Sequence, residues 1–183
     1  MKQLIAKVNH KKIAKLTVRK SKTVGKTVFM RKITIMLGGN LPGTAEAMDE
    51  AIKKFADSGV KNIRVSRAVS SPAVDCVPGT PDFLDMGLTG EYSGSAGELL
   101  ALCQKIEIEA GRPAIHSSRE SRILDCDIIF FGDEIIDRPD LTVPHPRAEI
   151  REFVLLPLSE LIPEQRFPDG KSVAGALAEL QNQ

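Results

Sequence analysis

Two aspartates separated by one residue, Asp125 and Asp127, are the part of this sequence best suited to bind a metal ion. In an extended strand, residues i and i+2 point to the same face, so their carboxylates would stand side by side, about 6–7 Å apart. Four apolar residues follow, which predicts that the strand enters a core, where neighbouring ionised carboxylates repel each other and resist desolvation. A divalent cation such as Mg²⁺ offsets both effects. The pair could equally face solvent at the mouth of the strand, and the spacing leaves both interpretations open.

Basic side chains precede the two aspartates. Arg112, Arg119 and Arg122 lie in the segment that leads to the predicted strand, together with His116. Guanidinium groups beside a metal ion suit a polyphosphate, because arginine can bind phosphate oxygens through two hydrogen bonds. Any one of them taken alone could instead be a solvated loop arginine.

A possible hydrogen-bond donor to phosphate follows the predicted strand in the sequence. It is His145, which has proline on both sides. The prolines favour an extended segment. The imidazole could donate to a phosphate, or it could be a capping or hydrogen-bonded structural histidine. The chain has no GxxxxGK[ST] phosphate loop and no kinase-type glycine or catalytic-loop motif, so a bound ATP would need a different scaffold.

The elements that must position these residues follow the order strand, helix, strand, strand, helix, strand. Apolar runs and alternation predict the strands, at 33–37, 63–68, 83–88 and 123–131. One helix is predicted between an N-cap at Thr44 and Gly59, and a second between a capping box at 95–98 and Gly111. This order predicts an α+β fold of the split βαβ, ferredoxin-like type, with a βαββαβ core and an antiparallel sheet. Additional C-terminal helices are predicted around 149–161 and 172–180.

Loops and helix faces carry weaker signals. The segment 70–81 contains three prolines and one glycine, and its length favours a functional role. With the polar segment 112–121, it is a candidate lid over a site. Gln104 and Glu107 share a polar helical face near Gly111, which by itself is typical of a solvated surface.

The composition fits one domain and excludes several classes of protein. The 183 residues are 42% hydrophobic, which is enough to bury a core. There is no run of eighteen apolar residues and no visible signal peptide, so no membrane partner is expected. Cys76, Cys103 and Cys126 lack C-x-x-C spacing, which predicts free thiols in a reducing compartment, the cytoplasm, and no zinc site.

Charge is distributed unevenly along the chain. Residues 1–32 hold 11 of the 25 basic residues and no acidic residue, so the remainder has 14 basic and 24 acidic residues, a net of −10. We therefore predict a flexible basic N-terminal extension, 1–32, ahead of a folded domain, 33–183. Such an extension can bind nucleic acid or anionic lipid. The near absence of aromatic residues for base stacking instead favours a leader segment or an upstream start, and argues against nucleic acid as a partner.

Five segments, in order, resemble the hydroxymethyl-dihydropterin pyrophosphokinase family. The most specific is 122–132, RILDCDIIFFG, which resembles the family signature R-x-L-D-x-D-I-x-x-F-G. The other four are the GGNL turn at 38–41, the helix end at Ile106, Glu107, Gly111 and Arg112, the block 141–145 with Arg151 and 153–158, and the turn at 167–170. The resemblance runs from about Ile33 to the C-terminus and implies the same ferredoxin-like fold.

The resemblance also implies a reaction. Members of this family transfer the β,γ-pyrophosphoryl unit of ATP to the hydroxymethyl group of 6-hydroxymethyl-7,8-dihydropterin and release AMP, a step of folate biosynthesis. ATP and a dihydropterin would be the partners of a chain expected to be a monomer, with a homo-oligomer left open. Two Mg²⁺ ions would bridge Asp125, Asp127 and the ATP phosphates, and Arg112 and Arg122 would hold phosphates.

The resemblance further implies which residues meet the two substrates. The implied nucleotide contacts are Gln104, Glu107, Ile128, Thr142, His145 and Arg151. The implied pterin contacts are Ser71, Pro72, Val74, Phe83, Asp85, Arg119 and Phe153.

The chain departs from the family pattern at a few positions. The family usually has asparagine where Asp85 stands and a second arginine where Ala114 stands, and often tryptophan where Arg119 stands; some members have tyrosine where Pro146 stands. Two alternatives therefore stay open. One is a divergent paralogue that binds ATP or a pterin with little catalysis, and the other is a nucleic-acid-associated protein that uses residues 1–32.

Overall fold

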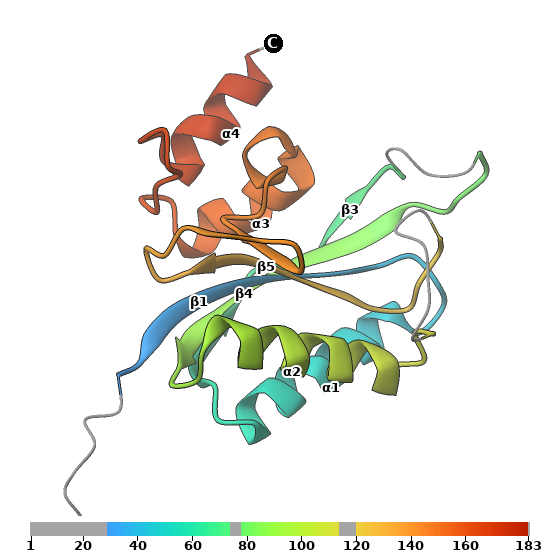
Figure 1. Ribbon diagram of the computed structural model, residues 1–183. Helices are drawn as coiled ribbons and strands as arrows, with labels where there is room; N and C mark the ends of the chain where they lie inside the picture. The colour runs from blue at the N-terminus through green and yellow to red at the C-terminus, as the bar shows by residue number, and fades with distance from the viewer. Residues whose placement is uncertain (1–28, 74–77, 114–119, 183) are drawn as a thin grey trace, which may run out of the picture.

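The computed structural model describes residues 29–73, 78–113 and 120–182. Its centre is an antiparallel sheet with the strand order β2-β4-β1-β5, and β3 also pairs with β4 (Figure 1). The bounds of these strands are β1 Arg31–Gly39, β2 Lys61–Val65, β3 Val69–Ser71, β4 Phe83–Tyr92 and β5 Asp125–Phe131. The longest strands, β4, β1 and β5, lie side by side in the middle and at one edge of the sheet.

Helices cover both faces of the sheet. One face carries α1 (Thr44–Asp57) and α2 (Ala96–Glu109), and the opposite face carries α3 (Glu152–Leu161) and α4 (Val173–Gln181) (Figure 1). A 3-10 turn, Ala148–Ile150, leads into α3. The predicted ferredoxin-like βαββαβ order with additional C-terminal helices is therefore confirmed. No helix in the three described stretches is long and apolar enough to cross a membrane.

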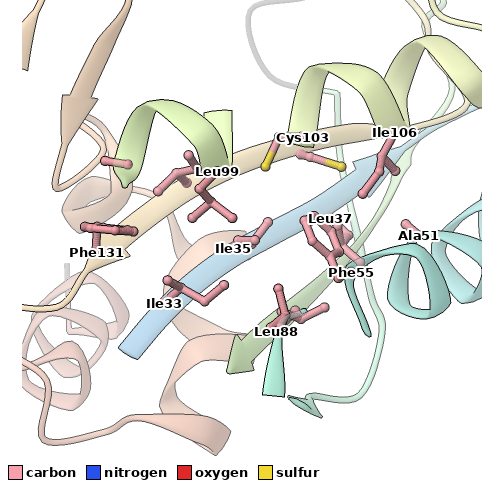
Figure 2. Close-up of a cluster of buried hydrophobic side chains, with 14 of the residues drawn as sticks. Ile33, Ile35, Leu37, Ala51, Phe55, Leu88, Leu99, Cys103, Ile106 and Phe131 are labelled. Carbon is pink, nitrogen blue, oxygen red and sulfur yellow. The ribbon is translucent and has the colours of Figure 1, made fainter. Parts of the chain in front are cut away.

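Side-chain alternation divides the core into two layers. On β1, Ile33, Ile35 and Leu37 pack against α1 and α2 (Figure 2), whereas Met36 packs against α3 and α4. On β5, Cys126 belongs to the first layer. Because strand side chains alternate, the residues on either side of Cys126 face the layer of α3 and α4.

Several boundaries differ from those predicted. The N-cap of α1 is Gly43, with φ 93°, and not Thr44. The Thr44 hydroxyl instead lies 2.8 Å from the carbonyl oxygen of Leu41 and 3.0 Å from that of Ile123, so it joins the start of α1 to the segment before β5. The capping box of α2 is present as predicted, between Ser95 and Glu98.

Short strands account for the remaining differences. The predicted loop 70–81 begins within β3, and β4 extends beyond the predicted end at residue 88 to Tyr92. The hairpin of β6 (Ile136–Arg138) and β7 (Leu141–Val143) was not predicted. The second strand lies at Lys61–Val65, slightly earlier than predicted, and β1 begins at Arg31, two residues before the expected start of the folded domain.

Gly39, at the end of β1, offers a test of this packing. A Cβ atom there would lie 2.2 Å from the carbonyl oxygen of Ile123 and 2.6 Å from Thr44 Oγ1. We expect Gly39→Ala to lower the free energy of unfolding by about 1–3 kcal/mol in urea denaturation, because backbone must move to admit the methyl group. The control is Gly97→Ala in α2, where the nearest atom would be 3.8 Å away. It should be neutral or slightly stabilising, and equal stabilities for the two variants would contradict the close approach.

Candidate active site

The register of the sheet brings distant carboxylates into one row. Gly38 on β1 pairs with Asp85 on β4 and, on its other side, with Asp125 on β5. In the next row, Met36 pairs with Gly87 and with Asp127. A Cβ atom at Gly38 would lie 3.0 Å from Asp85 Oδ1, so the missing side chain leaves room between the two carboxylates.

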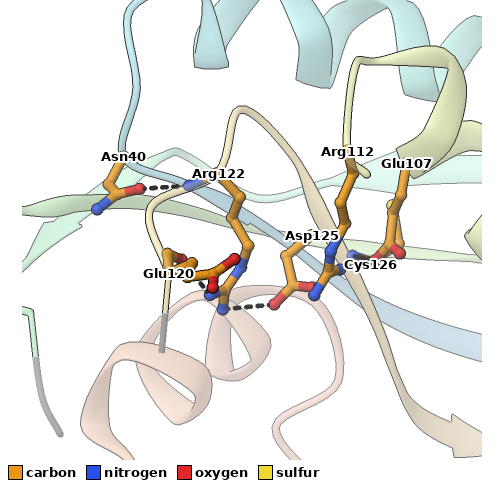
Figure 3. A network of polar contacts seen from close by, with 7 residues as sticks. All are labelled: Asn40, Glu107, Arg112, Glu120, Arg122, Asp125 and Cys126. Carbon is orange, nitrogen blue, oxygen red and sulfur yellow. Dashed lines mark hydrogen bonds and ion pairs between the residues drawn. The ribbon is translucent and has the colours of Figure 1, made fainter. Parts of the chain in front are cut away.

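Asp125 is held by two arginines (Figure 3). Arg112 Nη1 pairs with Asp125 Oδ1, and Arg122 Nη2 donates to Asp125 Oδ2 at 2.7 Å. The Asp125 side chain is 15% exposed, and those of Arg112 and Arg122 are 10% and 17% exposed. These ion pairs are therefore largely shielded from water. Shielded ion pairs attract each other more strongly than pairs at the surface.

Glu107 belongs to the same network and not to a solvated face. Its carboxylate is buried, and Oε1 accepts from the backbone N–H of Cys126 at 2.7 Å and pairs with Arg112 Nη1 at 2.8 Å. Burial, together with the charge of Asp125, raises the pKa of Glu107 to about 7. Glu107 thus fixes the residue between the two aspartates, whereas Gln104, on the same helix, is exposed.

Asp127 is the less compensated of the two aspartates. In the described stretches its carboxylate has no hydrogen bond or ion pair, and burial, together with the charge of Asp125, raises its pKa to about 7. A divalent cation would give the Asp127 carboxylate a positive partner. No group of three or more potential metal ligands occurs among the described residues.

His145 lies beyond β7 and is oriented by backbone groups. Its backbone N–H donates to the carbonyl oxygen of Ile129 at 3.1 Å, and its Nδ1 accepts from the backbone N–H of Arg147 at 3.3 Å. Burial and the charges of Arg151 and Arg147 lower its pKa to about 4. The imidazole is therefore neutral near pH 7, and because Nδ1 accepts, Nε2 carries the proton and can donate it.

The lowered pKa of His145 gives a pH test. The folded-state pKa lies below the ordinary 6.5, so between pH 6.5 and 4 the unfolded chain binds a proton that the folded chain does not. The stability of the wild type should therefore fall in this window relative to His145→Gln, by on the order of 1–2 kcal/mol. Urea unfolding of both proteins between pH 4.5 and 7.5 measures the difference, in which all shared titrations cancel. Parallel curves would show that the pKa of His145 is not shifted.

Of the residues predicted to meet the pterin, Ser71 contacts Asp85, and Phe83 and Phe153 each lie beside an arginine. Ser71 Oγ donates to Asp85 Oδ2 at 2.6 Å, and burial raises the pKa of Asp85 to about 6. The guanidinium carbon of Arg122 lies 5.2 Å from the centre of the Phe83 ring, and that of Arg151 lies 5.4 Å from the centre of the Phe153 ring. Pro72 follows Ser71 at the end of β3. Val74 and Arg119, also predicted here, lie outside the described residues.

The residues predicted to meet the nucleotide are more dispersed. Thr142 is exposed on β7, and Gln104 is exposed on α2. Ile128 packs in the same core layer as Cys103 of α2 and with β7, so its side chain points away from the face that carries Asp125. Any contact from Ile128 to a ligand on that face must therefore come from its backbone.

Asn40 has a role in the site that the sequence did not reveal, although the turn that contains it was noted. Asn40 is buried, and its Nδ2 donates to the carbonyl oxygen of Pro81 at 3.3 Å and to Ser121 Oγ at 3.2 Å. Its Oδ1 accepts from the backbone N–H of Arg122 at 2.9 Å (Figure 3). Asn40 therefore joins three segments of the site. Beside them is a cavity of about 140 Å³ lined by Leu41, Gly111, Arg112, Pro113, Glu120, Ser121, Arg122 and Ile123.

Known proteins resemble this chain in both sequence and fold. The model of the family described as 7,8-dihydro-6-hydroxymethylpterin-pyrophosphokinase (HPPK) matches residues 34–163. A 2-amino-4-hydroxy-6-hydroxymethyldihydropteridine pyrophosphokinase of Synechocystis sp. is 35% identical over 75% of this chain and 70% of its own length. The protein of the same name from Pseudomonas aeruginosa is 32% identical over 82% of this chain and 92% of its own length.

A solved structure of Plasmodium falciparum HPPK-DHPS is similar in fold. The TM-score is 0.65 at 13% identity, over 84% of this chain. The match covers 46% of the Plasmodium chain, so this protein spans less than half of that longer polypeptide. At this identity, the likeness shows the fold alone.

Proposed function

Because the chain belongs to the 7,8-dihydro-6-hydroxymethylpterin-pyrophosphokinase family, we propose that it transfers the pyrophosphoryl unit of ATP to 6-hydroxymethyl-7,8-dihydropterin. The products are AMP and the pterin pyrophosphate, and the step belongs to folate biosynthesis. The observation that best supports this proposal is the grouping of Asp125, Asp127, Arg112 and Arg122 at one end of the sheet, with Asp85 across Gly38.

The chemistry requires positioning and charge stabilisation more than a strong base. The hydroxyl oxygen of the pterin attacks the β-phosphorus and its proton passes to solvent. The bond from that phosphorus to the α,β-bridging oxygen breaks, and AMP leaves. Arg112 and Arg122 would bind the phosphate oxygens, where guanidinium groups stabilise developing negative charge. His145, neutral with its proton on Nε2, would donate a hydrogen bond to a phosphate without adding charge.

Magnesium fits the remaining part of the site. Asp125 and Asp127 would hold the Mg²⁺ ions, which when bound supply positive charge to the phosphate oxygens. The raised pKa of Asp127 and its lack of a hydrogen-bonding partner among the described residues support this assignment.

We assign the two substrates to two sides of this centre. The pterin would lie against Phe83 and Phe153 with Asp85 and Ser71 as polar partners, since a flat heterocycle suits apolar walls with few fixed polar contacts. The nucleotide would lie toward α2 and β7, near Gln104, Thr142 and Arg151, with Glu107 behind Arg112. Further proposed pterin contacts are Pro72, Val74 and Arg119. Ile128 is a further proposed nucleotide contact, through its backbone.

The location of the protein is a further proposal. Cys103 and Cys126 are free and buried, which is typical of a protein kept in a reducing compartment, here the cytoplasm.

An AMP-release assay tests the function. ATP, Mg²⁺ and 6-hydroxymethyl-7,8-dihydropterin should give AMP and pterin pyrophosphate in equal amounts, resolved by chromatography. The control substrate is 6-methyl-7,8-dihydropterin, which lacks the attacking hydroxyl and should give no AMP. ATP binding without pterin-dependent AMP release would favour the alternative of a binding protein with little catalysis.

A further inference from the structure

Both carboxylate oxygens of Asp125 pair with arginine. Oδ1 pairs with Arg112 and Oδ2 with Arg122, and both arginine side chains are less than a fifth exposed. A metal ion that approaches Asp125 in this state meets two guanidinium groups at the oxygens it needs. It would have to separate two shielded ion pairs, which is strongly unfavourable.

The two arginines are placed to change partners. Arg112 has a second carboxylate, Glu107, at 2.8 Å, so it keeps one ion pair when it leaves Asp125. Arg122 lies against the Phe83 ring and is anchored through its backbone to Asn40, so its guanidinium can turn while its backbone stays in place. Both arginines also line the cavity bordered by Leu41, Gly111 and Ser121, where a bound anion would compete with Asp125 for them.

We propose that the site works by arginine exchange: Arg112 and Arg122 block Asp125 against metal ions until a polyphosphate binds the two arginines and releases the carboxylate. This inference rests on the proposed function, because it takes the polyphosphate to be that of the nucleotide. Metal ion and nucleotide then bind as a coupled pair, and the coupling is reciprocal. Asp127 pairs with no arginine among the described residues. Its carboxylate is therefore not blocked in this way.

The first test measures metal binding without nucleotide. Mn²⁺ titrated into the full chain is followed by electron paramagnetic resonance of the free ion. We expect weak binding to the wild type and binding about tenfold tighter or more to Arg122→Gln. Arg151→Gln is the matched control, because it removes the same charge from a guanidinium that lies over the Phe153 ring. It should tighten binding much less. Arg112→Gln repeats the test at the other oxygen, and circular dichroism confirms that each variant is folded.

The second test measures ATP binding without metal. In EDTA, ATP must draw the arginines from Asp125 and leave its charge uncompensated. In Asp125→Asn that loss is absent, so metal-free ATP should bind at least about fivefold tighter than to the wild type, by calorimetry. The titrations are made at pH 8, above the raised pKa of Asp127 of about 7, so that Asp127→Asn also removes a negative charge. Asp127 forms no arginine pair among the described residues, and the gain of this variant should be smaller. A residue that acted only as a metal ligand would show no such gain in EDTA.

The outcomes separate this inference from the proposed function. Equal Mn²⁺ affinities for wild type, Arg112→Gln and Arg122→Gln, or equal gains in EDTA for Asp125→Asn and Asp127→Asn, would overturn arginine exchange. Neither measurement requires turnover or a pterin. Failure of the AMP-release assay would therefore overturn the proposed function and would leave arginine exchange to be decided by the two binding tests. Normal AMP release, together with metal-ion and ATP binding that are not coupled, would overturn arginine exchange alone.

Discussion

Replacing Asp127 with asparagine is expected to lower turnover by at least about a hundredfold, which corresponds to a barrier increase of roughly 2.7 kcal/mol. Asparagine is nearly isosteric with aspartate but lacks the negative charge that a hard divalent cation requires. Asp125→Asn should have a similar effect on turnover. The measurement is the rate of AMP release at saturating ATP and pterin over a range of Mg²⁺ concentrations.

The same substitution should not weaken the fold. The pKa of Asp127 is raised from 3.8 to about 7 in the folded state, so the folded chain binds the extra proton between these values. Stability contributed at this position therefore falls as pH rises from about 4 to 7 and stays low above pH 7. The substituted amide carries no charge at any of these pH values. In EDTA at pH 8 the Asp127→Asn protein should therefore unfold at the same temperature as the wild type or at a higher one.

Together these results would distinguish a functional carboxylate from a structural one. A structural aspartate loses stability and activity together when it is replaced. The control is Asp137→Asn on the exposed strand β6, which should change neither. Near-normal turnover at moderate Mg²⁺ in both Asp125→Asn and Asp127→Asn would refute the metal assignment.

Local sequence patterns predicted the long elements well. The strands β1 and β5 and the helices α1 and α2 each span seven or more residues, and the capping box at Ser95 is a local feature. β3, β6 and β7 have three residues each, which is too short for alternation to be distinguished from a loop. The prediction of Thr44 as the N-cap of α1 was wrong, because its hydroxyl donates to the carbonyl oxygen of Ile123, a residue far along the chain.

The site was predictable only in part for the same reason. The spacing of Asp125 and Asp127 places them on one face whatever the rest of the chain does. That Asp85 lies across Gly38 from Asp125 depends on the register of β1 with two strands. Glu107 and Gln104 share a polar face in the sequence, yet only Glu107 is buried, because Arg112 and the backbone of Cys126 provide its partners. Such pairings are set by tertiary structure and have no local signal.

Asp85 carries the second large expected effect. Asp85→Ala should weaken pterin binding at every pH, because the pterin loses a polar partner; an unmatched buried polar group costs on the order of 1–3 kcal/mol. Ser71 already donates to Oδ2, so Oδ1, on the side of Gly38, is the oxygen left for a ligand. Asparagine at this position offers the ligand a donor or an acceptor, whereas ionised aspartate only accepts.

The pterin can present to Asp85 either a hydrogen-bond acceptor or hydrogen-bond donors, and the pKa of Asp85 distinguishes these two orientations. Burial raises it to about 6, so the carboxyl is protonated below that value and then offers an O–H donor, as asparagine offers N–H. If the pterin presents an acceptor to Asp85, wild-type affinity should rise as pH falls through 6, and Asp85→Asn should bind about tenfold tighter than wild type at pH 8 for each 1.4 kcal/mol recovered. At pH 5 the two proteins should converge.

If the pterin instead presents its ring N–H and exocyclic amine, the trend reverses. The ionised carboxylate is then the better acceptor, wild-type affinity should fall as pH drops through 6, and Asp85→Asn should be neutral or harmful at pH 8. Ser71→Ala checks that Asp85 is the titrating group: the Ser71 hydroxyl lowers the pKa of Asp85, so its removal should move the midpoint to higher pH. Calorimetric titration of a dihydropterin between pH 5 and 8 gives all four curves. Equal, pH-independent affinities for wild type, Asp85→Asn and Asp85→Ala would show that Asp85 does not contact the pterin.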